Sequence, residues 1–331
     1  MILYLVIFGI AIALIFDFLN GMNDAANSIA TIVSTKVLSP LAAVIWAAFF
    51  NFAAAFIFGV HVAETIGKGI VHPSFMNVYF LLAALLGAII WSYSCTKLGL
   101  PISVSHALIG GLIGPGLMAG GLNALVTSGI IKVLAFIVLS PLIGMILAYF
   151  IMLIVMFLFK RVSPLRVDGY FRVLQLVSSA IFSLGHGSND AQKTMGIIAV
   201  LLFSTGYLGP TFYVPTWVIF TCYSAIALGT ATGGWKVIKT LGVGLTDLKP
   251  VGGFCAETAG ALTVIGSSLA GIPVSTTHTI TGSIMGVGLT RRLSAVRWGI
   301  AGNIVVAWVL TIPATMLLSM LFYATLRWFF M

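Results

Sequence analysis

Residues 21–28, with the sequence GMNDAANS, recur 166 residues later as residues 187–194, with the sequence GSNDAQKT. Both copies place an Asn-Asp pair inside long apolar surroundings, at positions 23–24 and 189–190. A carboxylate in a bilayer is costly, and by default it marks a substrate or ion site with a partner that offsets its charge. We therefore expect the rest of the chain to hold these two pairs close together.

The composition assigns the chain to the integral membrane proteins. Of its 331 residues, 60% are hydrophobic and only 7% are charged. A helix needs about 20 apolar residues to cross the hydrocarbon layer, and most apolar runs here are that long, without the alternation of barrel strands. The N-terminus has no basic region, so it predicts a first membrane segment rather than a cleaved signal peptide. The predicted fold class is an all-α polytopic membrane protein. The predicted location is the cell membrane, which the chain would cross several times.

A second pair of matching segments indicates an internal duplication. Residues 99–106 (GLPISVSH) correspond to residues 271–278 (GIPVSTTH), and glycines further along the two segments also coincide. We predict a first repeat at residues 1–159 and a second at residues 173–331. The polar stretch 160–172 between them is predicted to be a connecting loop in the cytoplasm.

Each repeat is predicted to open with a broken helix and to contain a half-length helix. In residues 2–33, and again in about 173–203, turn-forming and polar residues at the Asn-Asp pair interrupt an apolar run that is too long for a simple span. Irregular backbone at membrane depth is tolerated only where protein or a hydrated cavity satisfies it. Segments 101–118 and 273–289 are short, and the sequence leaves open whether they span the membrane or re-enter. The remaining spans are predicted at about 40–60, 77–97, 128–159, 214–234, 251–270 and 298–326.

The basic residues predict that the two halves face opposite sides of the membrane. Lys36 follows the first segment, whereas its counterpart 204–215 is uncharged; residues 119–127 are uncharged, whereas 291–299 carry three arginines. With five crossings in each half, the positive-inside rule places the basic stretch 160–172 in the cytoplasm and both termini outside. Such an inverted-topology repeat is typical of secondary transporters, whose sites lie at the repeat interface between broken helices.

The Asn-Asp pairs are predicted cation sites. Hard cations favour oxygen ligands, and an Asn-Asp pair beside unwound carbonyls supplies both charge and neutral oxygens. The alternative is that each pair only caps a half-helix, but two symmetric copies in lipid favour binding. Lys193 stands where the first copy has Asn27. It either offsets the charge of Asp190 or of the substrate, or extends to a membrane interface.

The half-length segments are predicted anion sites. Pro101 and Pro273 suit the first turn of a helix, where free N–H groups and the helix dipole favour an anion. The alternative is that the hydroxyls there only pack against neighbouring helices. The two histidines that follow either donate to the anion or pass a proton, or are buried and satisfied. The side chains assigned to the anion are Ser103, Ser105, His106, Ser275, Thr276, Thr277 and His278.

Two further carboxylates lie within apolar runs. Glu257 has no acidic counterpart in the first half, and it is a candidate coupling group, with a helix-pairing role as the alternative. Asp17 lies between two phenylalanines, and its residue pattern is compatible with both a site role and a structural one.

Together these motifs resemble the inorganic phosphate transporter (PiT) family, the cation-coupled phosphate symporters that include solute carrier family 20. The matching segments run nearly from end to end, at residues 21–28, 63–70, 101–106, 186–191 and 273–278. The resemblance implies a secondary symporter that imports inorganic phosphate with Na⁺ or H⁺ by alternating access. Transport of a related oxyanion such as sulfate is the alternative.

The resemblance also implies roles for individual residues. Phosphate would be held by the hydroxyl-rich helix starts, and Glu257 is similar to a glutamate that is important for transport in relatives. The chain departs from some members at Asn51, where they carry glutamate, and it lacks the long cytoplasmic insertion of the animal proteins. The coupling cations, with Na⁺ at the two aspartates, would be bound by Asn23, Asp24, Asn27, Asn189 and Asp190.

Other classes of function fit the sequence less well. A membrane enzyme would need an acid-base pair, a metal-ligand cluster or a nucleotide loop at credible spacing, and a passive channel would not need buried carboxylates in both halves. We expect no enzyme activity and no cofactor apart from the co-transported cation. The expected partners are phosphate, Na⁺ or H⁺ and the lipid bilayer, with no nucleic acid; a homodimer remains open.

Overall fold

The computed structural model describes residues 2–330. Within these residues the structure forms helices and no β-strand. The predicted all-α fold class is therefore confirmed. The first half contains α1 (Ile2–Ser34), α2 (Pro40–Ala53), α3 (His61–Lys68), α4 (Val78–Leu98), α5 (Val104–Gly120) and α6 (Thr127–Phe159). The second half contains α7 (Pro164–Ser204), α8 (Thr216–Thr232), α9 (Trp235–Gly244), α10 (Pro250–Leu269), α11 (Thr276–Leu289) and α12 (Trp298–Phe330). Short 3₁₀ turns lie between some of these helices, namely η1 (Ala54–Phe56), η2 (Pro73–Phe75), η3 (Gly121–Ala124) and η4 (Leu293–Ala295).

The helices fall into an outer and an inner group. Within the described residues, five helices are long and apolar enough to cross a membrane, namely α1, α4, α5 extended through η3, α6 and α12. A bent pair, α2 with η1 and then α3, adds a sixth candidate with a bend of 85°. The 33-residue helices α6 and α12 leave most of their apolar side chains uncovered, as a lipid-facing surface requires. In contrast, α7, α10 and α11 are largely buried.

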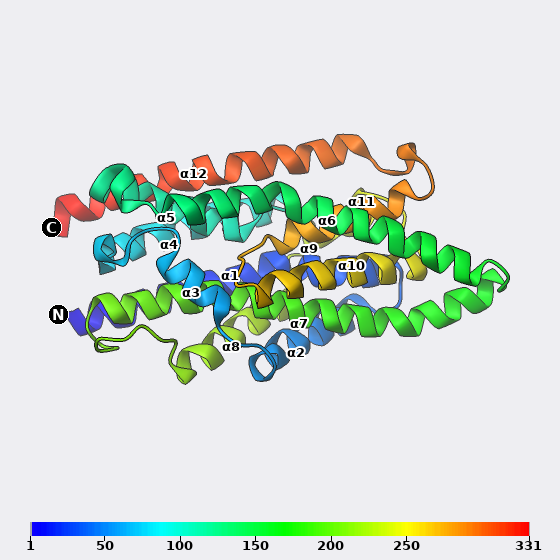
Figure 1. Cartoon of the computed structure of the whole chain (residues 1–331), viewed down its shortest axis with the longest axis horizontal. Helices are drawn as coiled ribbons and strands as arrows, with labels where there is room; N and C mark the ends of the chain where they lie inside the picture. Colours follow the sequence, from blue (N-terminus) through cyan, green and yellow to red (C-terminus); the bar gives the residue numbers. More distant parts are fainter. Residues whose placement is uncertain (1, 331) are drawn as a thin grey trace.

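The two halves contain the same series of elements, and the chain runs through them in opposite directions. Each half has a long first helix, a pair of shorter helices, a helix of about 20 residues, a short helix and a 33-residue last helix. In Figure 1 both termini lie at one end of the bundle, and the junction between α6 and α7 lies at the other. The first half therefore crosses from the end with the termini to the junction, and the second half returns.

The short helix of each half packs against the last helix of the other half. Helix α5 packs against α12, and α11 packs against α6. The contacts are close because glycines face backbone: a Cβ on Gly110 would lie 2.5 Å from the Ile312 carbonyl oxygen, and one on Gly282 would lie 2.1 Å from that of Pro141. These two glycines are repeat partners in the sequence. Each half thus completes the bundle of the other.

The predicted breaks in the first helix of each repeat are wrong. Helices α1 and α7 run without interruption through their Asn-Asp pairs. Gly21 is a packing residue rather than a helix breaker, because a Cβ there would lie 2.1 Å from the Ile226 carbonyl oxygen of α8. Gly187 serves α7 in the same way, with the Asn51 carbonyl oxygen 2.5 Å from the position of its Cβ. Close helix contact therefore accounts for both glycines.

The predicted connecting loop is also too long. Residues 160–172 were expected to be a loop, but α7 already begins at Pro164, where a proline at the first helical position suits a helix start. Only residues 160–163 separate α6 from α7.

The breaks lie instead between α4 and α5 and between α10 and α11. Gly99 and Gly271, which are repeat partners, end the preceding helices with left-handed φ angles of 75° and 64°. The prolines that follow lie outside the next helices, so their predicted place in the first turn is wrong. Ser103 and Ser275 are the N-caps, each accepting a hydrogen bond from the backbone N–H three residues later at 3.2 Å.

Candidate functional site

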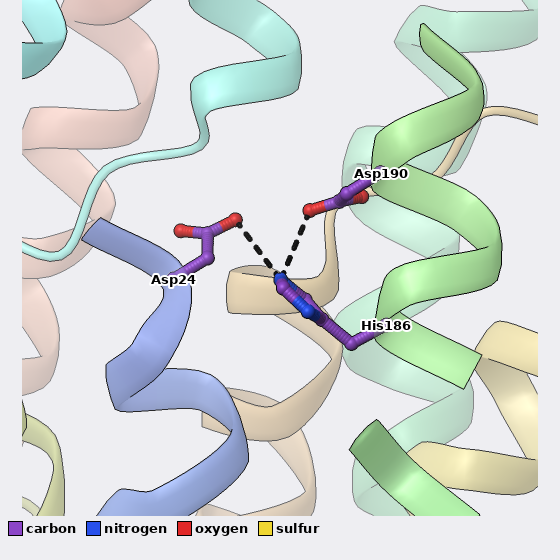
Figure 2. A group of neighbouring side chains, drawn as sticks. All are labelled: Asp24, His186 and Asp190. Atoms are coloured by element: carbon purple, nitrogen blue, oxygen red, sulfur yellow. Dashed lines mark ion pairs between the residues drawn. The ribbon is translucent and has the colours of Figure 1, made fainter. Parts of the chain in front are cut away.

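Asp24 of α1 and Asp190 of α7 face one another inside the bundle, with the imidazole of His186 between them (Figure 2). His186 Nε2 lies 3.3 Å from Asp190 Oδ2 and 3.9 Å from Asp24 Oδ2. All three side chains are at least 98% buried. Two carboxylates at such close quarters repel one another unless positive charge lies near both. The structure thus brings the two Asn-Asp pairs together, as the duplication predicted.

Asn51 of α2 orients the His186 ring. Its Oδ1 lies 3.0 Å from His186 Nδ1, and its Nδ2 donates to Thr230 Oγ1 at 2.9 Å, which fixes the amide in this orientation. Nδ1 therefore carries a proton and donates to Asn51. The other ring nitrogen, Nε2, faces the two carboxylates, either as a second N–H donor of an imidazolium or as a lone-pair ligand for a cation shared with them.

The first Asn-Asp pair is tied to the break after α4. Asn23 Nδ2 donates to Asp24 Oδ1 at 2.7 Å and lies 3.5 Å from the Ile102 carbonyl oxygen. Thr96 Oγ1 donates to Asn23 Oδ1 at 2.8 Å. This second bond leaves the amide of Asn23 directed at the carboxylate rather than free to supply an oxygen.

The second pair is tied to the break after α10 in a similar way. Asn189 Nδ2 donates to Ser268 Oγ at 2.9 Å and lies 3.4 Å from the Ile272 carbonyl oxygen. Ser268 is the repeat partner of Thr96, the residue that orients Asn23. The buried Oδ1 of Asn189 has no hydrogen-bond partner within residues 2–330, so it remains available as a ligand.

The start of α11 meets the first Asn-Asp element. Thr277 Oγ1 lies 3.3 Å from Asp24 Oδ1, and Thr276 Oγ1 lies 3.4 Å from Asp24 Oδ2 and 3.2 Å from Asp190 Oδ2. Asn27 Nδ2 donates to Thr277 Oγ1 at 2.9 Å. A helix start from the second half therefore supplies hydroxyls to a carboxylate of the first half.

The start of α5 meets the second element through Lys193. The ammonium of Lys193 donates to Asp190 Oδ1 and Ser105 Oγ and to the Val274 carbonyl oxygen at 2.9 Å. The lysine side chain is almost completely buried. Of the two hypotheses from the sequence, extension to a membrane interface is therefore wrong, and pairing with Asp190 is confirmed.

The two histidines of the predicted anion set contact each other. The rings of His106 and His278 pack edge to face with centroids 4.6 Å apart, and His278 stacks on Trp308 at 3.6 Å. His278 Nδ1 lies 3.3 Å from the Ile137 carbonyl oxygen. Both rings are buried. This packing favours the interpretation of His278 as a buried histidine held by its neighbours.

Glu257 belongs to a separate polar cluster. Its carboxylate accepts hydrogen bonds from Thr31 Oγ1 at 2.6 Å, Gln175 Nε2 at 3.0 Å and Ser178 Oγ at 2.5 Å. These donors come from α1 and α7, the helices that carry the two Asn-Asp pairs. The geometry is compatible both with coupling through those helices and with helix pairing.

Asp17 is buried on α1 about two helical turns before Asp24. Neither carboxylate oxygen of Asp17 has a hydrogen-bond partner among the described residues.

Three side chains form a candidate cation centre. Asp24, His186 and Asp190 offer ligand atoms that all lie within 4.8 Å of one another. Asn27, whose Nδ2 donates to Thr277 Oγ1, also carries a buried Oδ1 that has no hydrogen-bond partner within residues 2–330. A carboxylate with neutral oxygens around it is the type of ligand set that hard cations prefer. The Asp24 carboxylate with the Thr277 hydroxyl beside it therefore fits a Na⁺ ion.

Sequence reasoning missed His186 as a site residue. It precedes Asp190 by four positions on the same helix, and this spacing places the two side chains on one face. The contact with Asp24, across the two halves, had no signal in the local sequence. Thr96 and Ser268 were also missed, and Asn51 was noted only as a departure from some family members, because each acts through a long-range hydrogen bond.

The chain is similar to known proteins along nearly its whole length. The model of the phosphate transporter family matches residues 20–319. A probable low-affinity inorganic phosphate transporter of Rhizobium meliloti is 61% identical over 314 residues, which cover 95% of this chain and 94% of that protein. One of the same name from Bacillus subtilis is 42% identical over 330 residues, covering 99% of both chains.

A solved structure shares the fold. It is described as the sodium-dependent phosphate transporter, and it matches with a TM-score of 0.87 and 28% sequence identity, over 98% of this chain and all of the other. The relatives are named as transporters, so the prediction that the chain is not an enzyme is confirmed. From the family model and these two relatives, the chain belongs to the phosphate transporter family.

Proposed function

We propose that the protein is a symporter that imports inorganic phosphate together with a cation, by alternating access between its two halves. One observation carries the proposal: each Asp of an Asn-Asp pair lies in a buried centre completed by the hydroxyl-bearing helix start of the opposite half. Such an interface between repeats is where secondary transporters bind their substrates. The name of the structural relative, a sodium-dependent phosphate transporter, supports Na⁺ as the cation.

The charges explain why transport of phosphate needs a cation. Phosphate near neutral pH carries between one and two negative charges, and Asp24 and Asp190 already place negative charge at the site. In a buried environment, like charges at this range repel strongly. A cation bound beside Asp24, next to Thr277 Oγ1, removes this repulsion, so phosphate binds after or with it.

Hydroxyl and backbone N–H groups at the two helix starts are the proposed phosphate ligands. Ser105 opens α5, and Thr276 and Thr277 open α11, with the N-caps Ser103 and Ser275 just before them. Helix N-termini present free N–H groups and partial positive charge, which favour an anion. The two helix starts come from opposite halves, so movement of one half against the other changes the site and its access together.

Phosphate uptake into proteoliposomes tests this function. Purified protein is reconstituted, and uptake of radioactive phosphate is followed under an inward Na⁺ gradient, an inward proton gradient or neither. We expect accumulation above equilibrium under the Na⁺ gradient. Uptake that only equilibrates phosphate under every gradient would overturn the symport mechanism.

We also propose that the two halves are inverted repeats, with the α6–α7 junction in the cytoplasm and both termini outside. The course of the chain in Figure 1 supports opposite directions for the two halves. Basic residues at the junction support the orientation, since Arg172 near the start of α7 donates to the Lys36 carbonyl oxygen just after α1.

Single cysteines test the inversion. We expect a cysteine at Asn123, in η3, to react with an impermeant thiol reagent from outside the cell, and one at Ser294, in η4, to react only from the cytoplasmic side. Both positions are exposed, and the three native cysteines are buried, so the background is low. Labelling of both positions from the same side would contradict the inverted repeat.

A further inference from the structure

Lys193 breaks the symmetry between the two Asn-Asp elements. Three residues after Asp24 the first copy has Asn27, whereas three residues after Asp190 the second copy has Lys193. The Lys193 side chain is almost completely buried, and its ammonium is held by three oxygen atoms, from Asp190, Ser105 and the Val274 carbonyl. A buried ammonium with a carboxylate and two neutral oxygens has the surroundings of a bound monovalent cation.

The repeat relation identifies the corresponding oxygens of the first half. Ser105 corresponds to Thr277, and Val274 corresponds to Ile102, because the segments 99–106 and 271–278 are repeat partners. Thr277 Oγ1 lies 3.3 Å from Asp24 Oδ1. The serine oxygen near the ammonium thus has its counterpart, Thr277 Oγ1, beside the other aspartate.

The Ile102 carbonyl oxygen is linked to Asp24 through the amide of Asn23. Asn23 Nδ2 lies 3.5 Å from this oxygen and donates to Asp24 Oδ1 at 2.7 Å. The oxygens of Asp24 and Thr277, with the Ile102 carbonyl on the other side of the Asn23 amide, therefore correspond to the three oxygens that surround the Lys193 ammonium.

The first-half group contains no ammonium. Asn27 uses Nδ2 to donate to Thr277 Oγ1 and Thr276 Oγ1 at 2.9 and 3.2 Å. Its Oδ1 is buried and has no hydrogen-bond partner among the described residues. A buried oxygen without a hydrogen-bond partner is costly in the absence of a ligand. The first site therefore offers one more oxygen and lacks the positive charge that the second site already contains.

We propose that the ammonium of Lys193 permanently occupies the second of two symmetry-related cation sites, so that only the first, at Asp24, Asn27 and Thr277, binds a coupling cation. This inference rests on the proposed function only in taking the ligand to be a monovalent cation. Lys193 compensates Asp190, and one bound Na⁺ compensates Asp24. The chain thus moves one cation fewer per phosphate than a transporter with an asparagine at both positions.

His186 does not replace the lysine in this arrangement. Its Nε2 lies near Asp190 Oδ2, whereas Lys193 binds Asp190 Oδ1. His186 also approaches Asp24, at 3.9 Å from Oδ2, while Thr277 and Asn23 contact Asp24 Oδ1. The histidine bridges the two centres, and the lysine fills one of them.

Binding of radioactive Na⁺ to purified full-length protein in detergent, without phosphate, tests the inference. We expect the variant Lys193→Asn to bind one Na⁺ more per chain than the wild type. This variant gives the second copy the same residue that the first copy has at Asn27. Lys193→Arg is the matched control, because it keeps the positive charge, and it is expected to bind the same number as the wild type. Asn27→Lys places an ammonium in the first site, and it is expected to bind one Na⁺ fewer.

Unchanged Na⁺ stoichiometry in Lys193→Asn, with Asn27→Lys also unchanged, would overturn the inference. Folding is checked by the unfolding temperature of each variant with and without Na⁺, because a ligand that binds only the folded state raises it. If Lys193→Asn does not fold, the exchange variant Asn27→Lys with Lys193→Asn decides. Its Na⁺ binding is expected to depend on Asp190 rather than Asp24. Continued dependence on Asp24 would contradict the inference.

The readout is independent of phosphate transport. A gain of one Na⁺ in Lys193→Asn would support the inference even if the wild type failed to accumulate phosphate in proteoliposomes. Conversely, Na⁺-driven phosphate accumulation with no change in Na⁺ stoichiometry in the variants would leave the proposed function intact and remove the role of Lys193.

Discussion

Replacement of Asp24 by asparagine is expected to abolish Na⁺-coupled phosphate uptake while the protein still inserts and folds. Asparagine has nearly the same size as aspartate, so the packing around the buried side chain is preserved. The change removes the negative charge that would hold the cation beside Thr277 and Asn27. Since interactions with a charged group contribute about 1.5–3 kcal/mol each, the apparent Na⁺ affinity should fall about tenfold to a hundredfold for each one lost.

The measurement is initial phosphate uptake into proteoliposomes as a function of Na⁺ concentration. Asp247→Asn is a matched control, because it makes the same chemical change at a side chain that is 82% exposed and forms a surface ion pair with Arg297. Exposed pairs contribute little to stability, so this control should transport like the wild type. Wild-type Na⁺ dependence in Asp24→Asn would show that the carboxylate is structural.

Asp190→Asn is expected to destabilise the protein as well as to stop uptake, and this separates it from Asp24→Asn. Asp190 is the carboxylate partner of the buried Lys193 ammonium. Removal of one member of a buried ion pair leaves an uncompensated charge, which costs about 3–5 kcal/mol. Asp24 lies near His186 rather than near a lysine, so its replacement leaves no buried lysine without a partner.

Thermal unfolding of the purified variants in detergent measures the difference. The double variant Asp190→Asn with Lys193→Met removes both charges and is expected to recover much of the lost stability, because replacement of a whole buried pair by neutral groups is often nearly neutral. It should still fail in coupled uptake. Equal unfolding temperatures for Asp24→Asn and Asp190→Asn would contradict the assignment of Lys193 to Asp190.

The sequence predicted the parts of the fold that depend on composition and duplication. The apolar runs predicted the membrane helices, and the two copies of the Asn-Asp element predicted that Asp24 and Asp190 would meet. It failed where a residue acts through packing with a distant segment. Gly21 and Gly187 have the local signature of a helix break, but each admits the backbone of a helix from elsewhere in the chain. Local propensity was overridden by tertiary contact.

The same limit applies to the candidate site. The difference between the two copies, Asn27 in the first and Lys193 in the second, was visible in the sequence. The role of Lys193 depends on Ser105 and Val274, which lie 88 and 81 residues away in the chain. His186 carried a signal through its spacing from Asp190, whereas its approach to Asp24 depends on how α1 and α7 pack. The N-caps Ser103 and Ser275 displaced the prolines from the first turn because a serine hydroxyl satisfies a free N–H group and a proline does not.

The central claim is that a cation at Asp24 creates the conditions for phosphate binding at the helix starts. Isothermal titration calorimetry of phosphate into the purified protein, with Na⁺ and with a large organic cation in its place, tests it most directly. We expect phosphate to bind more tightly in Na⁺, and Na⁺ to bind more tightly in phosphate by the same factor, because coupling between two sites is reciprocal. Equal phosphate affinity in the two solutions would contradict the claim.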